Sequence, residues 1–324
     1  MAKKKFSAGL TFIACMLALI IGFAAAFFIY TYVNRESGGD VYVSGDLSIH
    51  FMELGNDRTG DSIYIKAGNT DILIDAGSTR ASSNTTASYM DEYITDGTLE
   101  FVIVTHADED HIAGFAGSTS SPSIFDRYDC EVIIDFARTN KNTAVYKDYV
   151  MQRDEAVAAG AKHYTALQCW NNADGAKRTY EVSNGIEMEI LYNYYYENES
   201  DDENNYSVCL MFNQGDTHFL FTGDLEEDGE SRLVDNNDLP EVELFKAGHH
   251  GSKTSSTDKL LQVIRPKIVC VCCCAGTDEY TDTKENQFPT QAMIDRVAPY
   301  TDRVYVTSQV DESAASGYRS MNGN

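Results

Sequence analysis

Positive charge is scarce in this sequence. Its 324 residues include 25 Lys and Arg against 50 Asp and Glu, which gives a net charge of −25. Lys3–Lys5 precede a long uncharged stretch, so the chain from Arg35 onward carries 22 basic and 50 acidic residues, a net charge of −28. Such a surface repels polyphosphate chains. The composition therefore argues against a general nucleic-acid-binding protein, although it leaves room for one basic pocket.

The eight cysteines do not form a disulfide framework. Four of them crowd into the stretch V-C-V-C-C-C-A at 269–275, Cys15 lies in an apolar run, and the other three are scattered. Adjacent residues of one strand rarely have the geometry to bridge each other. A thiolate metal site would need a second C-x-x-C pair to partner Cys270 and Cys273, and the sequence has none. We therefore interpret the 269–275 cysteines as small apolar residues of a buried strand.

Charged residues are missing between Phe6 and Asn34. Residues 6–33 are mostly apolar, long enough to cross roughly 30 Å of hydrocarbon as a helix. The apolar region of a cleavable signal peptide is shorter, about 7–15 residues. Because Lys3–Lys5 come first, the N-terminus is expected in the cytoplasm. We predict a basic tip (1–5), a transmembrane anchor (6–33), a polar linker (34–46) and an extracellular domain on the cell membrane. A cleaved signal peptide and a buried helix are the alternatives.

Beyond the linker, the pattern predicts one large α/β domain at 47–310, followed by a polar tail at 311–324. Strands come first in hairpins, then alternate with helices, and that order is repeated. Two mixed sheets packed face to face, with helices outside both, satisfy this order. The predicted fold is a four-layer αββα sandwich with strands near 47–54, 61–66, 71–75, 101–105, 131–136, 186–192, 208–212, 218–222, 243–246, 268–274 and 303–306, and with helices near 90–93, 144–161, 257–264 and 291–297.

Chemically reactive side chains follow three of the predicted strands. The segment H-A-D-E-D-H at 106–111 follows the first, T-G-D at 222–224 ends the second, and G-H-H-G-S at 248–252 follows the third. Loops at the carboxyl ends of strands host many sites in α/β folds. Imidazole and carboxylate together suit zinc, manganese or iron. An acidic loop with capping histidines, and a simple Gly-Asp turn, are the non-functional alternatives.

Four segments together resemble the metallo-β-lactamase superfamily. The resemblance is strongest to its competence-protein-like branch, the hydrolase domain found at the end of the DNA-uptake channel protein and in stand-alone relatives. The segments are S-I-Y-I-K…D-I-L-I-D-A-G-S (62–78), T-H-A-D-E-D-H-I-A-G-F (105–115), N-N-Y-S-V-C-L…F-L-F-T-G-D-L-E (204–226) and K-A-G-H-H-G-S-K-T-S-S (246–256). The resemblance implies an αββα sandwich and a site for two divalent metal ions, zinc or manganese.

The resemblance also implies residue roles. His106 and Asp108 would bind one metal ion, Asp110 and His111 the other, and Asp224 would bridge them. His250 would complete the ligand set of one metal ion, with His249 as the alternative ligand. Asp110 and His249 would be the catalytic residues. His249 would contact substrate or act as a proton carrier. The remaining assignments are Asp75 as a structural support behind the ligands, and Ser252, Lys253 and Asn205 as substrate-binding residues.

One histidine of the family pattern is missing. Many members carry another histidine between the H-x-x-x-D-H segment and the bridging Asp, but here only His163 and His218 lie in that interval. Neither has the flanking residues of a ligand. Asp108 also stands where many relatives have a histidine. The His106–Asp108 position is therefore expected to be the weaker one, with a preference shifted toward manganese.

These features predict a metal-dependent hydrolase on the outer face of the membrane. Two cations would activate a bridging hydroxide, and the favoured reaction is phosphodiester hydrolysis. The expected partners are a small-molecule or envelope phosphodiester substrate and the membrane, through the N-terminal helix. The −28 charge argues against long DNA, and no obligate protein partner is indicated. A lactonase or β-lactamase acting on a carbonyl, and a non-catalytic envelope-binding domain, are the alternatives.

Overall fold

The computed structural model describes residues 47–321. The predicted basic tip, anchor and linker lie outside these residues. Within 47–321, no helix is both long and apolar enough to cross a membrane.

The first sheet has six strands in the order of the sequence. Strands β1 to β3 form antiparallel hairpins, and β3 to β6 run parallel. Ile72, Leu73 and Ile74 of β3 are all buried, as expected for a strand covered on both faces. The six strands are β1 (Leu47–Phe51), β2 (Ile63–Ala67), β3 (Thr70–Ile74), β4 (Thr98–Ile103), β5 (Asp129–Asp135) and β6 (Lys162–Thr165).

The second sheet has eight strands, again in consecutive order. Strands β7 to β10 are antiparallel, β10 to β13 run parallel, and β14 returns antiparallel to β13. A two-residue turn at Gly215 and Asp216 closes the hairpin predicted there. The strands are β7 (Thr179–Ser183), β8 (Ile186–Ile190), β9 (Leu210–Gln214), β10 (Thr217–Phe221), β11 (Leu244–Lys246), β12 (Ile268–Ala275), β13 (Val304–Val310) and β14 (Tyr318–Ser320).

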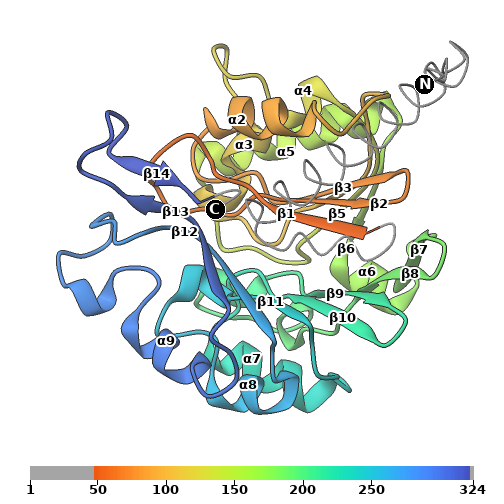
Figure 1. Cartoon of the computed structure of the whole chain (residues 1–324). Coiled ribbons are helices and arrows are strands. Elements are labelled where there is room, and N and C mark those ends of the chain that lie inside the picture. The colour runs from red at the N-terminus through yellow and green to blue at the C-terminus, as the bar shows by residue number, and fades with distance from the viewer. Residues whose placement is uncertain (1–46, 322–324) are drawn as a thin grey trace, which may run out of the picture. The chain divides into compact units, whose positions relative to one another are not determined.

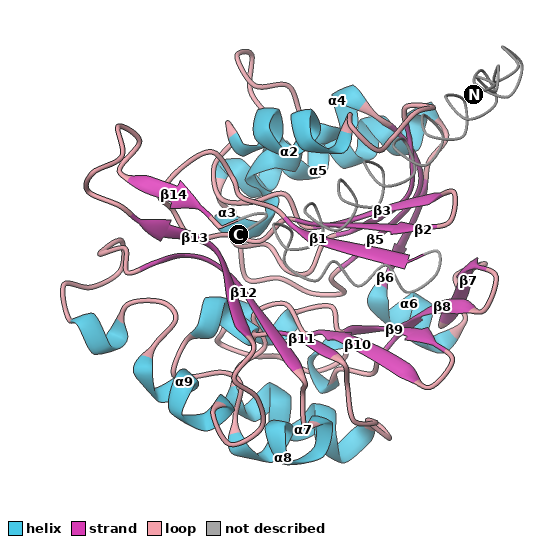
Figure 2. Ribbon diagram, viewed as in Figure 1, coloured by secondary structure: helices cyan, strands magenta, loops and turns pink. Residues whose placement is uncertain are grey.

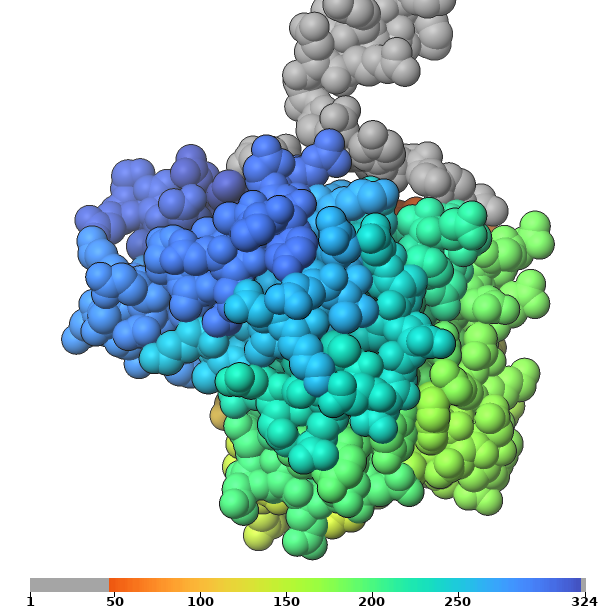
Figure 3. All heavy atoms as spheres, turned by 90° about the horizontal axis from the view of Figure 1, so that it is seen from below, coloured from red at the N-terminus to blue at the C-terminus, as the bar shows by residue number. Residues whose placement is uncertain are grey.

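Helices cover the outer face of each sheet, so the described residues form the expected αββα sandwich (Figures 1 and 2). The first sheet carries α2 (Ser82–Met90), α3 (Glu109–Ala116), α4 (Ile124–Arg127) and α5 (Ala144–Ala159). The second sheet carries α7 (Glu227–Asn236), α8 (Asp258–Ile264) and α9 (Gln291–Val297), on the face that Figure 3 shows from below. The short α6 (Ala166–Asn171) follows β6. The described residues also contain four 3-10 turns, which are η1 (Tyr194–Tyr196), η2 (Glu203–Tyr206), η3 (Gly248–Gly251) and η4 (Lys284–Asn286).

Side chains alternate between two apolar layers along the second sheet. Leu210 and Phe212 of β9 belong to the core shared with the first sheet, whereas Met211 packs in the layer under α7 to α9. The cysteines of β12 follow the same rule, with Cys272 in the first layer and Cys273 in the second. The cysteines in the described residues are free thiols. The 269–275 stretch is thus a buried strand, as its composition predicted.

Three local predictions from the sequence are wrong. A helix expected near 90–93 instead occupies Ser82–Met90, where seven polar or small residues hid it. The predicted elements leave the segment 194–205 without a helix or strand, yet it contains η1 and part of η2, with Tyr196 fully buried. The third error concerns the polar tail expected from residue 311, because β14 pairs with β13 and extends the sheet to Ser320.

Candidate metal centre

His111 lies in the first turn of α3, and its ring is fixed from behind. Its Nδ1 is 2.8 Å from Oδ2 of Asp75. Asp75 also accepts hydrogen bonds from the backbone N–H and the hydroxyl of Thr105, at 2.8 and 2.6 Å. The Nε2 of His111 faces the other way, 3.1 Å from Oδ2 of Asp224. Asp75 therefore orients the imidazole, and the free face of the ring points to the carboxylate at the end of β10.

His250 approaches the same carboxylate from the second sheet. It lies in η3 with a left-handed backbone conformation (φ 52°), and its Nδ1 donates to the carbonyl of Cys272 at 2.9 Å. Its Nε2 is 2.9 Å from Oδ2 of Asp224, 3.3 Å from Nε2 of His111 and 3.2 Å from Oδ2 of Asp110. Two imidazole nitrogens and two carboxylate oxygens, contributed by both halves of the sandwich, thus converge.

Burial and charge act in opposition at this cluster. Burial opposes the charged form of His111, but Asp224 and Asp75 outweigh it and raise the pKa of His111 well above its usual value. Burial likewise opposes a charged His250, and Asp224 and Asp61 raise its pKa. The pKa of Asp224 is held well below its ordinary value by His250 and His111, despite its burial. The carboxylates therefore require positive charge here, which a divalent cation can supply.

Asp61 and Lys246 belong to the centre, although no role was predicted for either from the sequence. Asp61, His111, Asp224 and His250 each offer a ligand atom within 4.8 Å of the others. However, Asp61 reaches the Nδ1 side of His250, at 3.2 Å, and forms an ion pair with the buried Lys246. Asp110 instead lies on the Nε2 side. We therefore place Asp110 among the ligand candidates and Asp61 behind them, as a support for His250 and Lys246.

Lys246 is the charged last residue of an otherwise apolar strand, L-F-K. Its Nζ contacts Asp61, Oδ1 of Asp224 at 3.2 Å and the carbonyl of Gly223 at 3.1 Å. Burial opposes its charge, but Asp61 and Asp224 raise the pKa of Lys246 above its usual value. A buried charge of this kind persists only when it is paired. The signal in the sequence was therefore a charged residue where an apolar one was expected.

His106 and Asp108 lie beside the cluster. The His106 ring is fully buried, 4.1 Å from the His111 ring between centroids, and its Nδ1 is 3.1 Å from the Thr105 hydroxyl. Its Nε2 has no hydrogen-bond partner among residues 47–321, and Oδ2 of Asp108 is 3.6 Å away. The other oxygen of Asp108 forms an ion pair with Lys141. A buried imidazole nitrogen without a partner fits a ligand or a hydrogen bond to something bound.

The donor set fits one divalent metal ion well. Four groups face one another with the chemistry that zinc and manganese prefer, and they are Asp110, His111, Asp224 and His250. Each imidazole has its second nitrogen occupied by Asp75 or by the Cys272 carbonyl, which is the usual arrangement around metal-binding histidines.

The predicted substrate residues lie at separate places. Nδ1 of His249 is 3.0 Å from Oε1 of Glu226, and the side chain is a quarter exposed. The hydroxyl of Ser252 is 2.9 Å from that of Thr254, and Lys253 reaches outward to Asn286 at 3.4 Å. Asn205 is 7% exposed, donates to Ser200 at 3.1 Å and lines a hollow of about 450 Å³. Ser252 and Lys253 therefore do not form a cluster pointing at the ligand candidates.

The two remaining histidines of the interval lie elsewhere. His163 pairs with Asp135 at 2.8 Å on β6, and His218 contacts Asn213 at 2.7 Å within the β9–β10 hairpin. Neither joins the ligand candidates.

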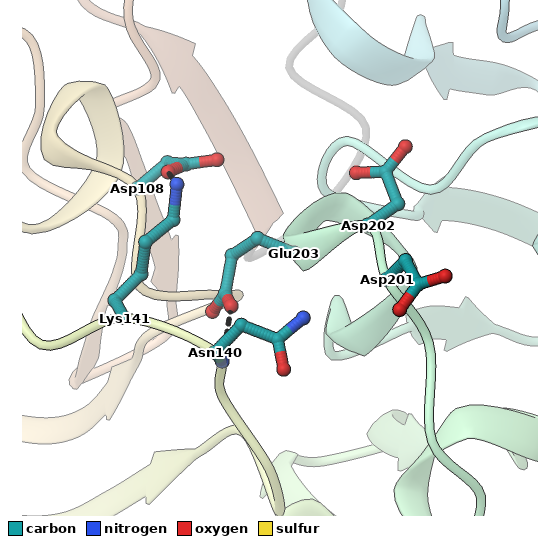
Figure 4. Close-up of a pocket in the computed structure, with 6 residues that line it drawn as sticks. All are labelled: Asp108, Asn140, Lys141, Asp201, Asp202 and Glu203. Carbon is teal, nitrogen blue, oxygen red and sulfur yellow. Dashed lines mark hydrogen bonds and ion pairs between the residues drawn. The ribbon is translucent and has the colours of Figure 1, made fainter.

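A cavity of about 600 Å³ opens beside Asp108. Figure 4 shows the Lys141 ammonium turned toward the Asp108 carboxylate on one side, with the acidic segment 201–203 on the other. Glu203 is held inside the protein by the backbone N–H of Asn140 at 2.6 Å and by the Thr139 hydroxyl at 2.6 Å. The lining residues are Asp108, Asn140, Lys141, Asp201, Asp202 and Glu203.

Comparisons with known proteins agree with this geometry. The Metallo-beta-lactamase superfamily model matches residues 55–122 and 201–275, the two segments that carry the ligand candidates. ComE operon protein 3 of Bacillus subtilis is 27% identical over 222 residues, which cover 65% of this chain and 24% of that protein. Recombination protein 2 of Haemophilus influenzae is 28% identical over 120 residues, or 37% of this chain and 13% of that protein. The chain spans a quarter or less of these curated relatives.

Among solved structures, the metallo-beta-lactamase fold protein YhfI from Bacillus subtilis is similar, with a TM-score of 0.46 and 9% identity over 80% of this chain and 95% of that one. The matched segments contain Asp61, Asp75, the 106–111 ligands, Asp224 and His250. The chain therefore carries a metallo-β-lactamase superfamily domain, with a candidate metal-binding cluster between its two sheets.

Proposed function

We propose that this chain is a metal-dependent hydrolase of phosphodiesters. The observation that carries the proposal is the convergence of His111, His250, Asp110 and Asp224, with both imidazoles oriented from behind. A divalent ion bound there would act as a Lewis acid and lower the pKa of water. Asp75 and the Cys272 carbonyl hold the imidazoles in place, and the half-buried His249, turned by Glu226, is a group that could carry a proton at the edge of the site.

The surroundings favour a substrate of low net charge. The cavity next to Asp108 has one lysine but several acidic residues, and the second hollow is lined by Glu226, Glu227 and Asp228. A polyanion such as long DNA would be repelled by these walls. A single phosphodiester with a neutral or cationic group attached would not. This supports a small-molecule or envelope phosphodiester over nucleic acid.

We also propose that the domain acts outside the cell membrane, held there by residues 6–33. The three lysines that precede the apolar run support this orientation. Protease added to intact cells should then remove a tag placed at the C-terminus, and a tag that stays protected would contradict the orientation.

Hydrolysis by the Asp110→Ala variant tests the proposed activity. The full chain, Asp110→Ala and Glu109→Ala are loaded with Mn²⁺ or Zn²⁺ and assayed on bis(p-nitrophenyl) phosphate, p-nitrophenyl phosphorylcholine, DNA and a cephalosporin. Glu109 is the matched control, because it is an exposed carboxylate in the same turn. We expect phosphodiester hydrolysis that falls at least about 100-fold in Asp110→Ala and stays unchanged in Glu109→Ala. Cleavage of the cephalosporin alone would favour a carbonyl hydrolase instead.

A further inference from the structure

The candidate ligands separate into two groups according to what already touches them. Asp110, His111, Asp224 and His250 face one another with their ligand atoms free of lysine contacts, apart from Oδ1 of Asp224. His106 and Asp108 lie outside this group. The Asp108 carboxylate is instead bound by the ammonium of Lys141, which comes from the loop after β5.

The charges around the centre match a single divalent ion. Five carboxylates lie around it, and they are Asp61, Asp75, Asp108, Asp110 and Asp224. Two lysines neutralise two of these charges, Lys246 beside Asp61 and Lys141 beside Asp108. Asp75 lies behind His111 on its Nδ1 side, so one divalent ion balances the two carboxylates on the Nε2 side of the imidazoles, Asp110 and Asp224. A second ion would face carboxylates that already have a cation, and like charges a few ångströms apart repel strongly in a buried site.

The geometry of Asp224 leads to the same result. Oδ1 of Asp224 is 3.2 Å from Nζ of Lys246, and only Oδ2 faces the two imidazoles. To bind a second ion through Oδ1, Asp224 would have to give up its ion pair with Lys246. Because the Lys246 side chain is fully buried, bulk water could not take the place of the lost carboxylate oxygen. Leaving a buried ammonium with one partner fewer is costly.

We infer that the centre holds one tightly bound divalent metal ion, among Asp110, His111, Asp224 and His250, and that the Lys141 ammonium takes the place of a second ion beside His106 and Asp108. This inference rests on the proposed metal-dependent function and departs from the two ions that the family resemblance implies.

Lys141 is placed to act on substrate as well. Its side chain is 31% exposed and lines the 600 Å³ cavity, so a phosphoryl oxygen entering from that side would meet its charge (Figure 4). An ammonium offers three hydrogen-bond donors and a compact positive charge. It can therefore stabilise a negatively charged oxygen as a second ion would, without demanding further carboxylate ligands.

Metal stoichiometry tests the inference. The full chain, purified in detergent and stripped with a chelator, is titrated with Mn²⁺ alone, and bound metal is measured by elemental analysis after gel filtration. Electron paramagnetic resonance then distinguishes isolated from coupled Mn²⁺ ions. The same measurement is made on Lys141→Ala and on the control Lys147→Ala, an exposed lysine of α5.

We expect one isolated Mn²⁺ per chain in the wild type and in Lys147→Ala. In Lys141→Ala we expect a second equivalent that binds at least about tenfold more tightly than in the wild type, with a coupled signal. Two tightly bound, coupled ions in the wild type would overturn the inference and leave the proposed function standing. No bound ion would overturn both, and a Lys141→Ala variant that stays at one ion would overturn the role of Lys141.

Discussion

At the scale of the residue, each imidazole of the centre has one nitrogen occupied by the protein and one directed at the carboxylates. Asp75 contacts Nδ1 of His111, and the Cys272 carbonyl accepts a hydrogen bond from Nδ1 of His250. Lys246 and Asp61 add a buried ion pair behind them. These contacts orient the ligand candidates, so metal affinity should depend on residues that do not themselves touch the ion.

Replacing Asp75 tests this dependence. In Asp75→Ala, His111 loses the acceptor for Nδ1 and Thr105 loses two hydrogen bonds. We expect metal affinity to fall about 10–100-fold and the free energy of unfolding to fall by about 1–3 kcal/mol for each buried donor left unpaired.

Asp75→Asn is the matched control, because Asn tolerates the left-handed backbone of this position (φ 56°) and keeps one acceptor. Compared with Asp75→Ala, this variant should lose less metal affinity in a metal titration and less free energy of unfolding in urea. An Asp75→Ala variant that binds metal as tightly as the wild type would refute the supporting role of Asp75.

At the scale of the element, the start of α3 is fixed by the loop after β3. The backbone N–H of Ala76 donates to the His111 carbonyl at 2.9 Å, and that of Asp61 donates to the Asp110 carbonyl at 3.1 Å. Gly77 packs against the same carbonyl, so closely that a Cβ at 77 would lie 1.4 Å from the Asp110 oxygen. The position of Asp110 and His111 therefore depends on a glycine in a neighbouring loop.

Gly77→Ala should displace this turn of α3. Because a Cβ cannot occupy the space of the Asp110 carbonyl, the two segments must move apart, which costs about 1–3 kcal/mol or more. We expect a lower melting temperature together with loss of tight metal binding. Gly97→Ala is the comparison, since a Cβ there meets open space. Its only cost in folding free energy is the left-handed backbone (φ 79°), about 1–2 kcal/mol. Equal metal affinity in the two variants would contradict the packing argument.

Elements with a clear apolar pattern could be predicted from the sequence, and those that depend on tertiary contacts could not. The apolar runs at 71–74 and 268–274 became buried strands, as their composition predicted. The S-S-N-T-T-A-S stretch of α2 has no apolar face and is helical because Ser82, Ser83 and Thr86 are buried against the rest of the fold. The turn of α3 within 106–111 was likewise hidden among charged residues that suggest a loop.

The candidate site followed the same division. The ligand types and their strand ends could be identified from motifs, since residues near the carboxyl ends of strands converge. Asp61 could not be identified in this way, because its role depends on contacts with His250 and Lys246, which lie far along the chain. The ion pair between Asp108 and Lys141 was hidden for the same reason.

At the scale of the whole molecule, the sequence from Arg35 onward has a net charge of −28, and the two hollows near the centre are lined by several acidic residues. An anionic polymer should be repelled, and salt screens that repulsion within about 8–10 Å at physiological ionic strength. Under the proposed function, this charge should disfavour substrates with many phosphates over those with one.

Salt dependence of hydrolysis tests this selection. We expect kcat/KM for single-stranded DNA to be low and to rise as NaCl increases from about 20 to 200 mM, because repulsion is screened. The value for the zwitterionic p-nitrophenyl phosphorylcholine should change little over the same range. DNA hydrolysis that instead weakens steeply with salt would show attraction to the polyanion and contradict the account.

The most direct test of the central claim is anomalous X-ray diffraction from crystals of the protein grown with Mn²⁺ or Zn²⁺, recorded on both sides of the metal absorption edge. We predict one strong anomalous peak within about 2.0–2.3 Å of Nε2 of His111, Nε2 of His250 and Oδ2 of Asp224. No peak at that position, or a peak only at the β12 cysteines, would contradict the assignment of this cluster as a metal centre.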